Sequence, residues 1–179
     1  MGFLSKLFGT PKNQTEDRSD YGSLLVPPSA EAEALLSAMT EEEKSNFFGL
    51  LRHLQEWHES VTEKAPLSFH PEARASLWGT ALAKVADHYR ETARNDKALF
   101  FMSAAWNMSK YPVFAYNAAI LSSEAGDDKH ARALLETYLA EYRKVPTTAS
   151  MMLVNPSMTI EELESLAASA RARLAGQEK

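Results

Sequence analysis

The 179-residue sequence contains no cysteine. Disulfide bonds, thiolate metal sites and cysteine nucleophiles are therefore excluded, and a reducing compartment is permitted. No stretch of the sequence reaches the roughly 20 consecutive apolar residues that a membrane-spanning helix needs. The first residues also lack a secretory apolar stretch followed by small residues. These absences predict a cytoplasmic protein.

Residues that interrupt helices or favour strands are scarce as well. Only seven glycines and eight prolines occur, and the middle of the chain is rich in Ala, Leu, Glu, Lys, Met and Arg, which favour helices. The few valines are scattered, and no stretch alternates β-branched and polar residues as a half-buried strand would. We therefore expect an all-α fold.

The charge balance argues against one class of partner. The formal net charge is -5, the pI is about 5.6, and the basic residues are scattered along the chain. A general nucleic-acid binder usually carries a basic surface, so no nucleic-acid partner is expected. With 45% hydrophobic residues, the chain has enough apolar side chain to form the core of one ordinary domain.

Composition divides the chain into three parts. Residues 1–9 are expected to form a short amphipathic segment, because Phe3, Leu4, Leu7 and Phe8 share one face of a helix. Residues 10–28 are predominantly polar up to Ser23 and are predicted to form a flexible linker. Residues 29–176 are expected to form the helical domain.

The amphipathic segment has three interpretations that the sequence leaves open. It binds a membrane surface, it binds a groove on a partner protein, or it is a disordered end. The first interpretation predicts a peripheral membrane-associated assembly or targeting factor, so a location at the periphery of a membrane is the alternative to a purely cytoplasmic one.

Capping signals predict where the helices of the domain begin and end. Ser29 is expected to cap the first helix, and Thr40 with Glu43 forms the S/T-x-x-E capping box of the second. Asp127 and Asp128 are expected to cap a later helix, and Thr159 with Glu162 is expected to open the last. The predicted helices cover approximately residues 30–39, 41–64, 71–94, 97–111, 112–126, 128–142 and 160–176, with a turn at Asn95 and Asp96.

Two pairs of adjacent aromatic residues stand out within the helices. They are Phe47–Phe48 and Phe100–Phe101. Neighbours on a helix diverge by about 100°, so both members of a pair cannot point to a single contact. We expect one member of each pair to meet a second helix or a partner.

The sequence also contains an internal period. A shift of about 33 residues matches Ala86 with Ala119, Ala98 with Ala131 and Met102 with Leu135. Small residues at such places let one helix pack closely on the next, and large ones fill the groove beside them. Helix pairs with a fixed period are typical of stacked repeats, although a generic antiparallel bundle is the alternative.

On these residues the chain resembles the tetratricopeptide family, over approximately residues 77–143. Seven residues of the first unit follow the family's pattern: Leu82, Val85, Ala86, Tyr89, Ala98, Met102 and Ala105. The second unit keeps Ala119, Gly126, Ala131 and Leu135, but it departs from the pattern at Ser122 and Tyr138. The resemblance implies a right-handed superhelix of antiparallel helix pairs, with capping helices at both ends.

The resemblance further implies a concave groove that binds a peptide or helix of another protein. The candidate partner-binding residues lie on the first helix of each pair, and they are Lys84, His88, Tyr116, Asn117 and Ile120. The amide of Asn117 would bond to a peptide backbone, and Lys84 would meet a carboxylate. In the competing interpretation, Tyr116 and Ile120 belong to the core and Asn117 is only solvated.

Catalytic machinery is not visible in the sequence. It contains no glycine-rich phosphate loop, nucleophile elbow or H-E-x-x-H motif, and His53 and His58 are too far round a helix from each other to share a metal. We expect no catalytic residues, metal or cofactor. The predicted function is a non-enzymatic protein–protein interaction module, such as an adaptor, scaffold or chaperone.

Overall fold

The structure, a computed structural model, describes residues 24–62, 71–142 and 160–176. Every regular element in these three ranges is a helix, so the predicted all-α class is confirmed. The helices are α2 (Ala30–Ala38), α3 (Glu41–Thr62), α4 (Pro71–Glu91), α5 (Asn95–Ser109), α6 (Pro112–Glu124), α7 (Asp128–Glu141) and α9 (Ile160–Gly176). The amphipathic segment 1–9 and the cap predicted at Thr159 lie outside the described residues.

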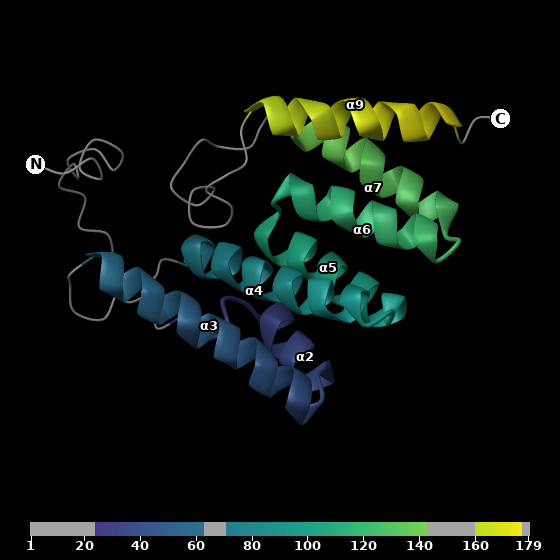
Figure 1. Cartoon of the computed structure of the whole chain (residues 1–179). Helices are drawn as coiled ribbons and strands as arrows, with labels where there is room; N and C mark the ends of the chain where they lie inside the picture. Colours follow the sequence, from purple (N-terminus) through teal and green to yellow (C-terminus); the bar gives the residue numbers. More distant parts are fainter. Residues whose placement is uncertain (1–23, 63–70, 143–159, 177–179) are drawn as a thin grey trace, which may run out of the picture.

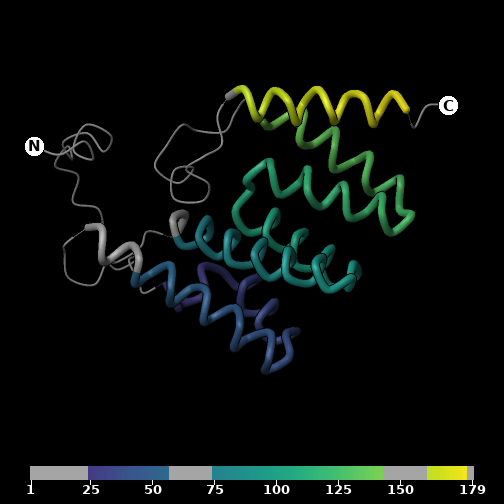
Figure 2. The backbone as a smooth tube through the Cα atoms, in the orientation of Figure 1, coloured from purple at the N-terminus to yellow at the C-terminus, as the bar shows by residue number. Residues whose placement is uncertain are grey.

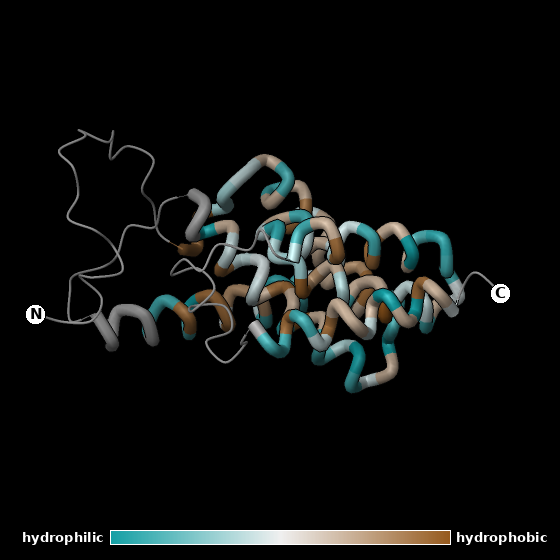
Figure 3. Tube along the Cα trace, turned by 90° about the horizontal axis from the view of Figure 1, so that it is seen from above, coloured by the Kyte–Doolittle hydropathy of each residue, from teal (hydrophilic) through white to brown (hydrophobic). Residues whose placement is uncertain are grey.

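The helices stack in chain order, from α2 and α3 at one end to α9 at the other (Figure 1). The closest packing joins α4 with α5 and α6 with α7, and α5 with α6 connects these two pairs. Short connections return each of these helices against the one before it (Figure 2). Seen from above, hydrophilic residues gather at the outer turns of the stack (Figure 3).

Three of the predicted caps are confirmed. The Ser29 hydroxyl accepts the Ala32 N–H at 3.3 Å. In the capping box, the Thr40 N–H donates to the Glu43 carboxylate at 2.8 Å, and the Glu43 N–H donates to the Thr40 hydroxyl at 3.2 Å. At the start of α7 the Asp127 carboxylate accepts the N–H of His130, the third residue of the helix, at 3.0 Å. These bonds satisfy donors that a helix start otherwise leaves unpaired.

The turn between α4 and α5 lies earlier than the sequence predicts. Asn95 and Asp96, the predicted turn, already belong to α5. Ala93 instead takes a left-handed conformation with φ 58°, and its N–H donates to the Arg90 carbonyl at 3.0 Å. The next N–H, of Arg94, donates to the Tyr89 carbonyl at 2.9 Å. This closing geometry satisfies the last carbonyls of α4 and ends the helix before the predicted Arg94.

The same turn recurs 33 residues later. Gly126 has φ 81°, its N–H donates to the Ser123 carbonyl at 3.0 Å, and the Asp127 N–H donates to the Ser122 carbonyl at 2.9 Å. The residues that the period pairs in the sequence are all buried, namely Ala86, Ala98, Met102, Ala119, Ala131 and Leu135. The 33-residue period in the sequence therefore corresponds to a repeated turn and to repeated buried positions in the structure. The likeness to the tetratricopeptide family stays a prediction.

The packed body begins at Leu24, five residues before the predicted boundary at residue 29. The Leu24 side chain is 0% exposed, and its carbonyl accepts the indole N–H of Trp78 at 2.7 Å. The Trp78 ring in turn packs edge-on against Phe47 of α3, with 4.9 Å between centroids. The predicted boundary is therefore too late, because the buried Leu24 and the hydrogen bond from the Trp78 indole already hold the chain against α4.

At the other end of the stack, α9 covers α6 and α7. It buries Leu163, Ala167 and Ala170. The hydroxyl of Tyr138, in α7, donates to the Leu163 carbonyl at 2.9 Å. The Tyr116 hydroxyl of α6 reaches the Ser169 hydroxyl at 3.0 Å. The helix therefore packs its apolar residues against the last pair of the stack.

Candidate partner-binding site

A groove of about 890 Å³ lies between α2, the first turns of α4, and α5. Its walls are mainly apolar, and we call it the α2–α5 groove. The lining residues are Pro28, Ser29, Glu31, Leu35, Ala38, Ala75, Leu99, Phe100, Ser103, Ala104, Asn107, Met108 and Lys110. This size and lining are typical of binding sites, in which a few polar groups surround an apolar surface.

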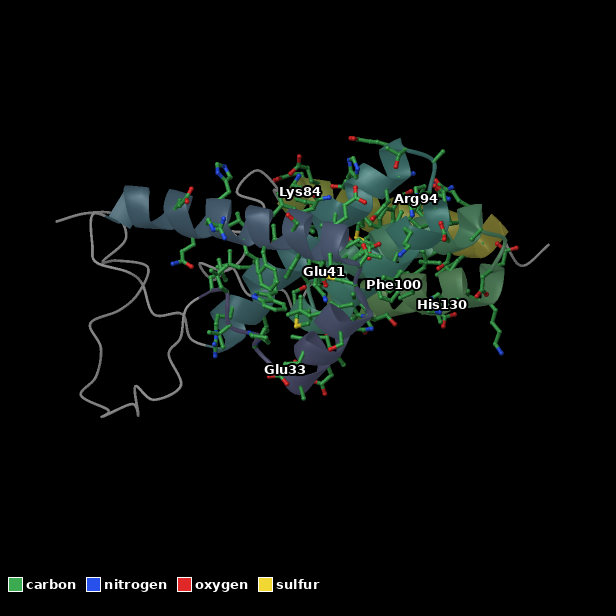
Figure 4. The ribbon with its side chains drawn as sticks, turned by 90° about the horizontal axis from the view of Figure 1, so that it is seen from below. Glu33, Glu41, Lys84, Arg94, Phe100 and His130 are labelled. Atoms are coloured by element: carbon green, nitrogen blue, oxygen red, sulfur yellow. The ribbon has the colours of Figure 1, made fainter. Side chains whose placement is uncertain are left out.

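Phe100 is the most exposed large apolar side chain of the groove. It lies in α5 beside Phe101, and 44% of it is exposed. Phe101 is fully buried and stacks on Tyr89 of α4, with 5.5 Å between ring centroids and 9° between planes. The sequence predicts that one member of this pair meets a second helix or a partner. In the structure Phe101 packs against α4, and Phe100 lines the groove (Figure 4).

The opposite wall belongs to α2. This helix is held to the core by Ala32 and Met39, which are buried. Leu35 lies between these two anchors and is only half-buried, with Leu99 of α5 in the same state across the groove. Leu35 and Leu99 both pack partly against the core, and the part of each side chain that stays uncovered contributes apolar surface to the groove.

Two charged side chains lie in the groove. Hydrogen bonds from its own backbone N–H and from Ser29 lower the pKa of Glu31 below the ordinary value, so Glu31 is an anion at neutral pH. Lys110 follows the end of α5, and its ammonium lies 5.3 Å from the centroid of the Trp106 ring. This cation–π contact draws Lys110 toward an aromatic face. The groove thus has a negative group on α2 and a positive group beyond α5.

A buried carboxylate, that of Glu43, joins α3 to both α4 and α5. The Glu43 side chain, 4% exposed, accepts hydrogen bonds from the Lys97 ammonium at 2.8 Å and the Tyr89 hydroxyl at 3.0 Å. Burial alone raises the pKa of Glu43, but the bonds from Lys97, the Thr40 backbone and Tyr89 outweigh it and lower the pKa to about 2. Glu43 therefore joins the start of α3 to α4 and α5, and it holds the groove's α5 wall in place.

The predicted partner-binding residues lie on other surfaces. Lys84 and His88 are exposed on α4, and Asn117 is half-buried on α6. Tyr116 is 8% exposed, and its ring packs against Tyr138 at 5.4 Å between centroids. Figure 4 places Lys84 at one edge of the stack and Glu33 of α2 at the other. The predicted face on α4 is therefore separate from the α2–α5 groove.

Ile120 lines a second, smaller cavity. The cavity has a volume of about 180 Å³ and lies between α6, α7 and Arg173 of α9. Tyr116 and Ile120 thus both sit where α9 approaches α6. Sequence reasoning missed the α2–α5 groove because α2 lies outside the repeat, and the one signal for the groove was the Phe100–Phe101 pair.

Other kinds of site receive no support in the part of the chain that the structure describes. No group of three or more His, Asp or Glu side chains there could hold a metal ion. No helix within residues 24–62, 71–142 and 160–176 is long and apolar enough to cross a bilayer. No protein-family model, curated protein or solved structure matches this chain, so the groove and its chemistry carry the functional argument.

Proposed function

We propose that this protein is a non-enzymatic protein–protein interaction module whose α2–α5 groove binds an apolar peptide or helix of a partner. An adaptor, scaffold or chaperone works in this way. The observation that carries the proposal is the 44% exposed Phe100 in a groove that is also lined by Leu35, Leu99 and Met108. Amphipathic helices place apolar side chains into such grooves at helical spacing.

The energetics favour Phe100 as the main contact. Fully burying a phenylalanine side chain is worth about 1.5–3 kcal/mol, so covering the exposed 44% would contribute on the order of 1 kcal/mol. Aromatic residues at the centre of an interface commonly contribute most to affinity. A charge at position 100 would in addition be desolvated by any apolar partner.

The experiment begins with a photoreactive phenylalanine analogue at position 100 in the native host, followed by mass spectrometry of the crosslinked peptide. The identified partner segment is then synthesised and titrated onto the wild-type chain and onto Phe100→Glu. We expect Phe100→Glu to weaken binding at least about tenfold. Lys129→Ala, an exposed change on α7, is the matched control and should leave affinity unchanged.

The face predicted from the repeat is tested in the same titration. Lys84→Ala and Asn117→Ala change its polar residues without touching the α2–α5 groove. Loss of binding in these two variants, with Phe100→Glu unaffected, would assign the partner to the α4–α6 face and overturn the proposed site. Circular dichroism of each variant separates lost binding from lost folding.

A further inference from the structure

We infer that the α2–α5 groove is occupied in cis by the amphipathic segment, residues 1–9 of the same chain. The inference uses the groove of the proposed function but does not depend on the existence of a partner. It rests on where the described chain begins, on the length of chain before that point, and on the chemistry of the segment.

The described chain begins at Leu24, four residues before Pro28, which lines the groove. Leu24 is held in the core by the bond from Trp78, and Pro28 and Ser29, a few residues further on, already line the groove. The residues that precede Leu24 are therefore joined to the body within a few residues of the groove's α2 wall. The groove is therefore a nearby binding surface for a segment that precedes Leu24.

The chain between the segment and Leu24 is long enough. Residues 9–23 separate Phe8 from Leu24, and their polar composition predicts a coil. A coil of that length spans about 20–25 Å root-mean-square. The α5 wall has 15 residues, which corresponds to about 22 Å of helix. The segment can therefore reach the whole groove, and its effective concentration there is in the millimolar range.

The chemistry of the segment also fits. In a helix, Phe3, Leu4, Leu7 and Phe8 would make one apolar stripe of about two turns. Such a stripe suits the apolar surface made by the half-buried Leu35 and Leu99 and the exposed Phe100. Within residues 1–9 the only charged side chain is Lys6, and the groove presents the Glu31 carboxylate on α2. Lys110, the other charge in the groove, lies over the Trp106 ring and leaves Glu31 as the counter-ion for Lys6.

A cis ligand lowers the apparent affinity of any partner for the groove. If a two-turn segment binds with a dissociation constant in the millimolar range, its millimolar effective concentration reduces partner affinity on the order of two- to tenfold. Substitutions that remove its apolar stripe would then tighten partner binding by the same factor.

The absence of cysteine allows a direct test. Ser5→Cys introduces a single thiol for a nitroxide spin label in the full chain, and paramagnetic broadening of backbone amides reports which residues the label approaches. We expect loss of signal over α2 and α5 at the groove, with α7 and α9 unaffected. The same label in a chain with Leu4→Gln and Leu7→Gln should lose this broadening, as should a chain with Phe100→Glu. Glu42→Gln, exposed on α3, is the control that should keep it.

Two outcomes would overturn the inference. One is broadening that survives the Leu4→Gln and Leu7→Gln changes, or that never appears in the groove. The other is equal broadening when labelled chains are mixed with isotope-enriched unlabelled chains, since a second copy would then be the occupant. If broadening is absent and the partner segment still binds at Phe100, the cis inference fails while the proposed function stands. If broadening appears in the groove but no partner segment binds there, the cis inference stands and the proposed function fails.

Discussion

Glu43→Gln is expected to destabilise the fold at neutral pH and to have little effect in acid. In the folded state, bonds from Lys97, Thr40 and Tyr89 lower the pKa of Glu43 from 4.5 to about 2. The side chain is 4% exposed, so solvent screens these bonds weakly. A shift of that size corresponds to about 3 kcal/mol of stability, because one pKa unit is worth about 1.4 kcal/mol.

The sign of the pH dependence follows from the direction of the shift. A carboxyl whose pKa is lowered by folding contributes fully above its unfolded pKa, and the contribution disappears as the pH falls through the folded value. The deficit of Glu43→Gln should therefore be about 3 kcal/mol near pH 7 and shrink to about 1 kcal/mol near pH 2.5.

Urea unfolding followed by tryptophan fluorescence at both pH values measures this difference. Glu42→Gln, one residue away but exposed, is the matched control and should change stability by less than about 0.5 kcal/mol at either pH. A deficit of Glu43→Gln that is the same in acid and at neutral pH would refute the reasoning. The destabilisation would then come from the shape of the amide and not from the lost charge.

Four further substitutions, one of them with a second-site rescue, test the packing and the repeated turn. Ala93→Gly should stabilise the protein by about 1 kcal/mol and Gly126→Ala should destabilise it by a similar amount, because both positions have positive φ and a Cβ at Gly126 meets no atom within 4 Å. Equal melting temperatures for the pair would contradict this. Gly79→Ala should cost about 1–3 kcal/mol in chemical denaturation, since the added Cβ would lie 2.6 Å from the Ser109 Cβ where α4 crosses α5. Ser109→Gly in the same chain should restore most of the loss, and failure to do so would place the clash elsewhere. Ser122→Ala should raise stability by up to about 1 kcal/mol, because the buried hydroxyl has no hydrogen-bond partner among the described residues. A lower melting temperature for Ser122→Ala would reveal a bond to this hydroxyl.

The local features of the fold were predictable because their causes lie within a few residues of each other. The Ser29 cap, the Thr40–Glu43 box and the Asp127 cap each satisfy N–H groups within three residues, and the sequence alone specifies them. The 33-residue period was readable for a related reason, since small and large residues recur where successive helices touch. The turn before α5 was misplaced because Ala93 is not a residue type that usually adopts positive φ.

The candidate site depends on contacts between residues that are distant in the chain. The partners of Glu43 lie 46 and 54 residues away, and the indole that holds Leu24 is 54 residues away, so no local pattern indicates either contact. The sequence by itself determined the absence of cysteine, and it predicted both the helical class of the described residues and the 33-residue recurrence of their turns. Only tertiary packing decided that Phe101 stacks on Tyr89 of α4 while Phe100 lines the groove. The two residues are equally apolar and point about 100° apart, so only the positions of the neighbouring helices determine which one is covered.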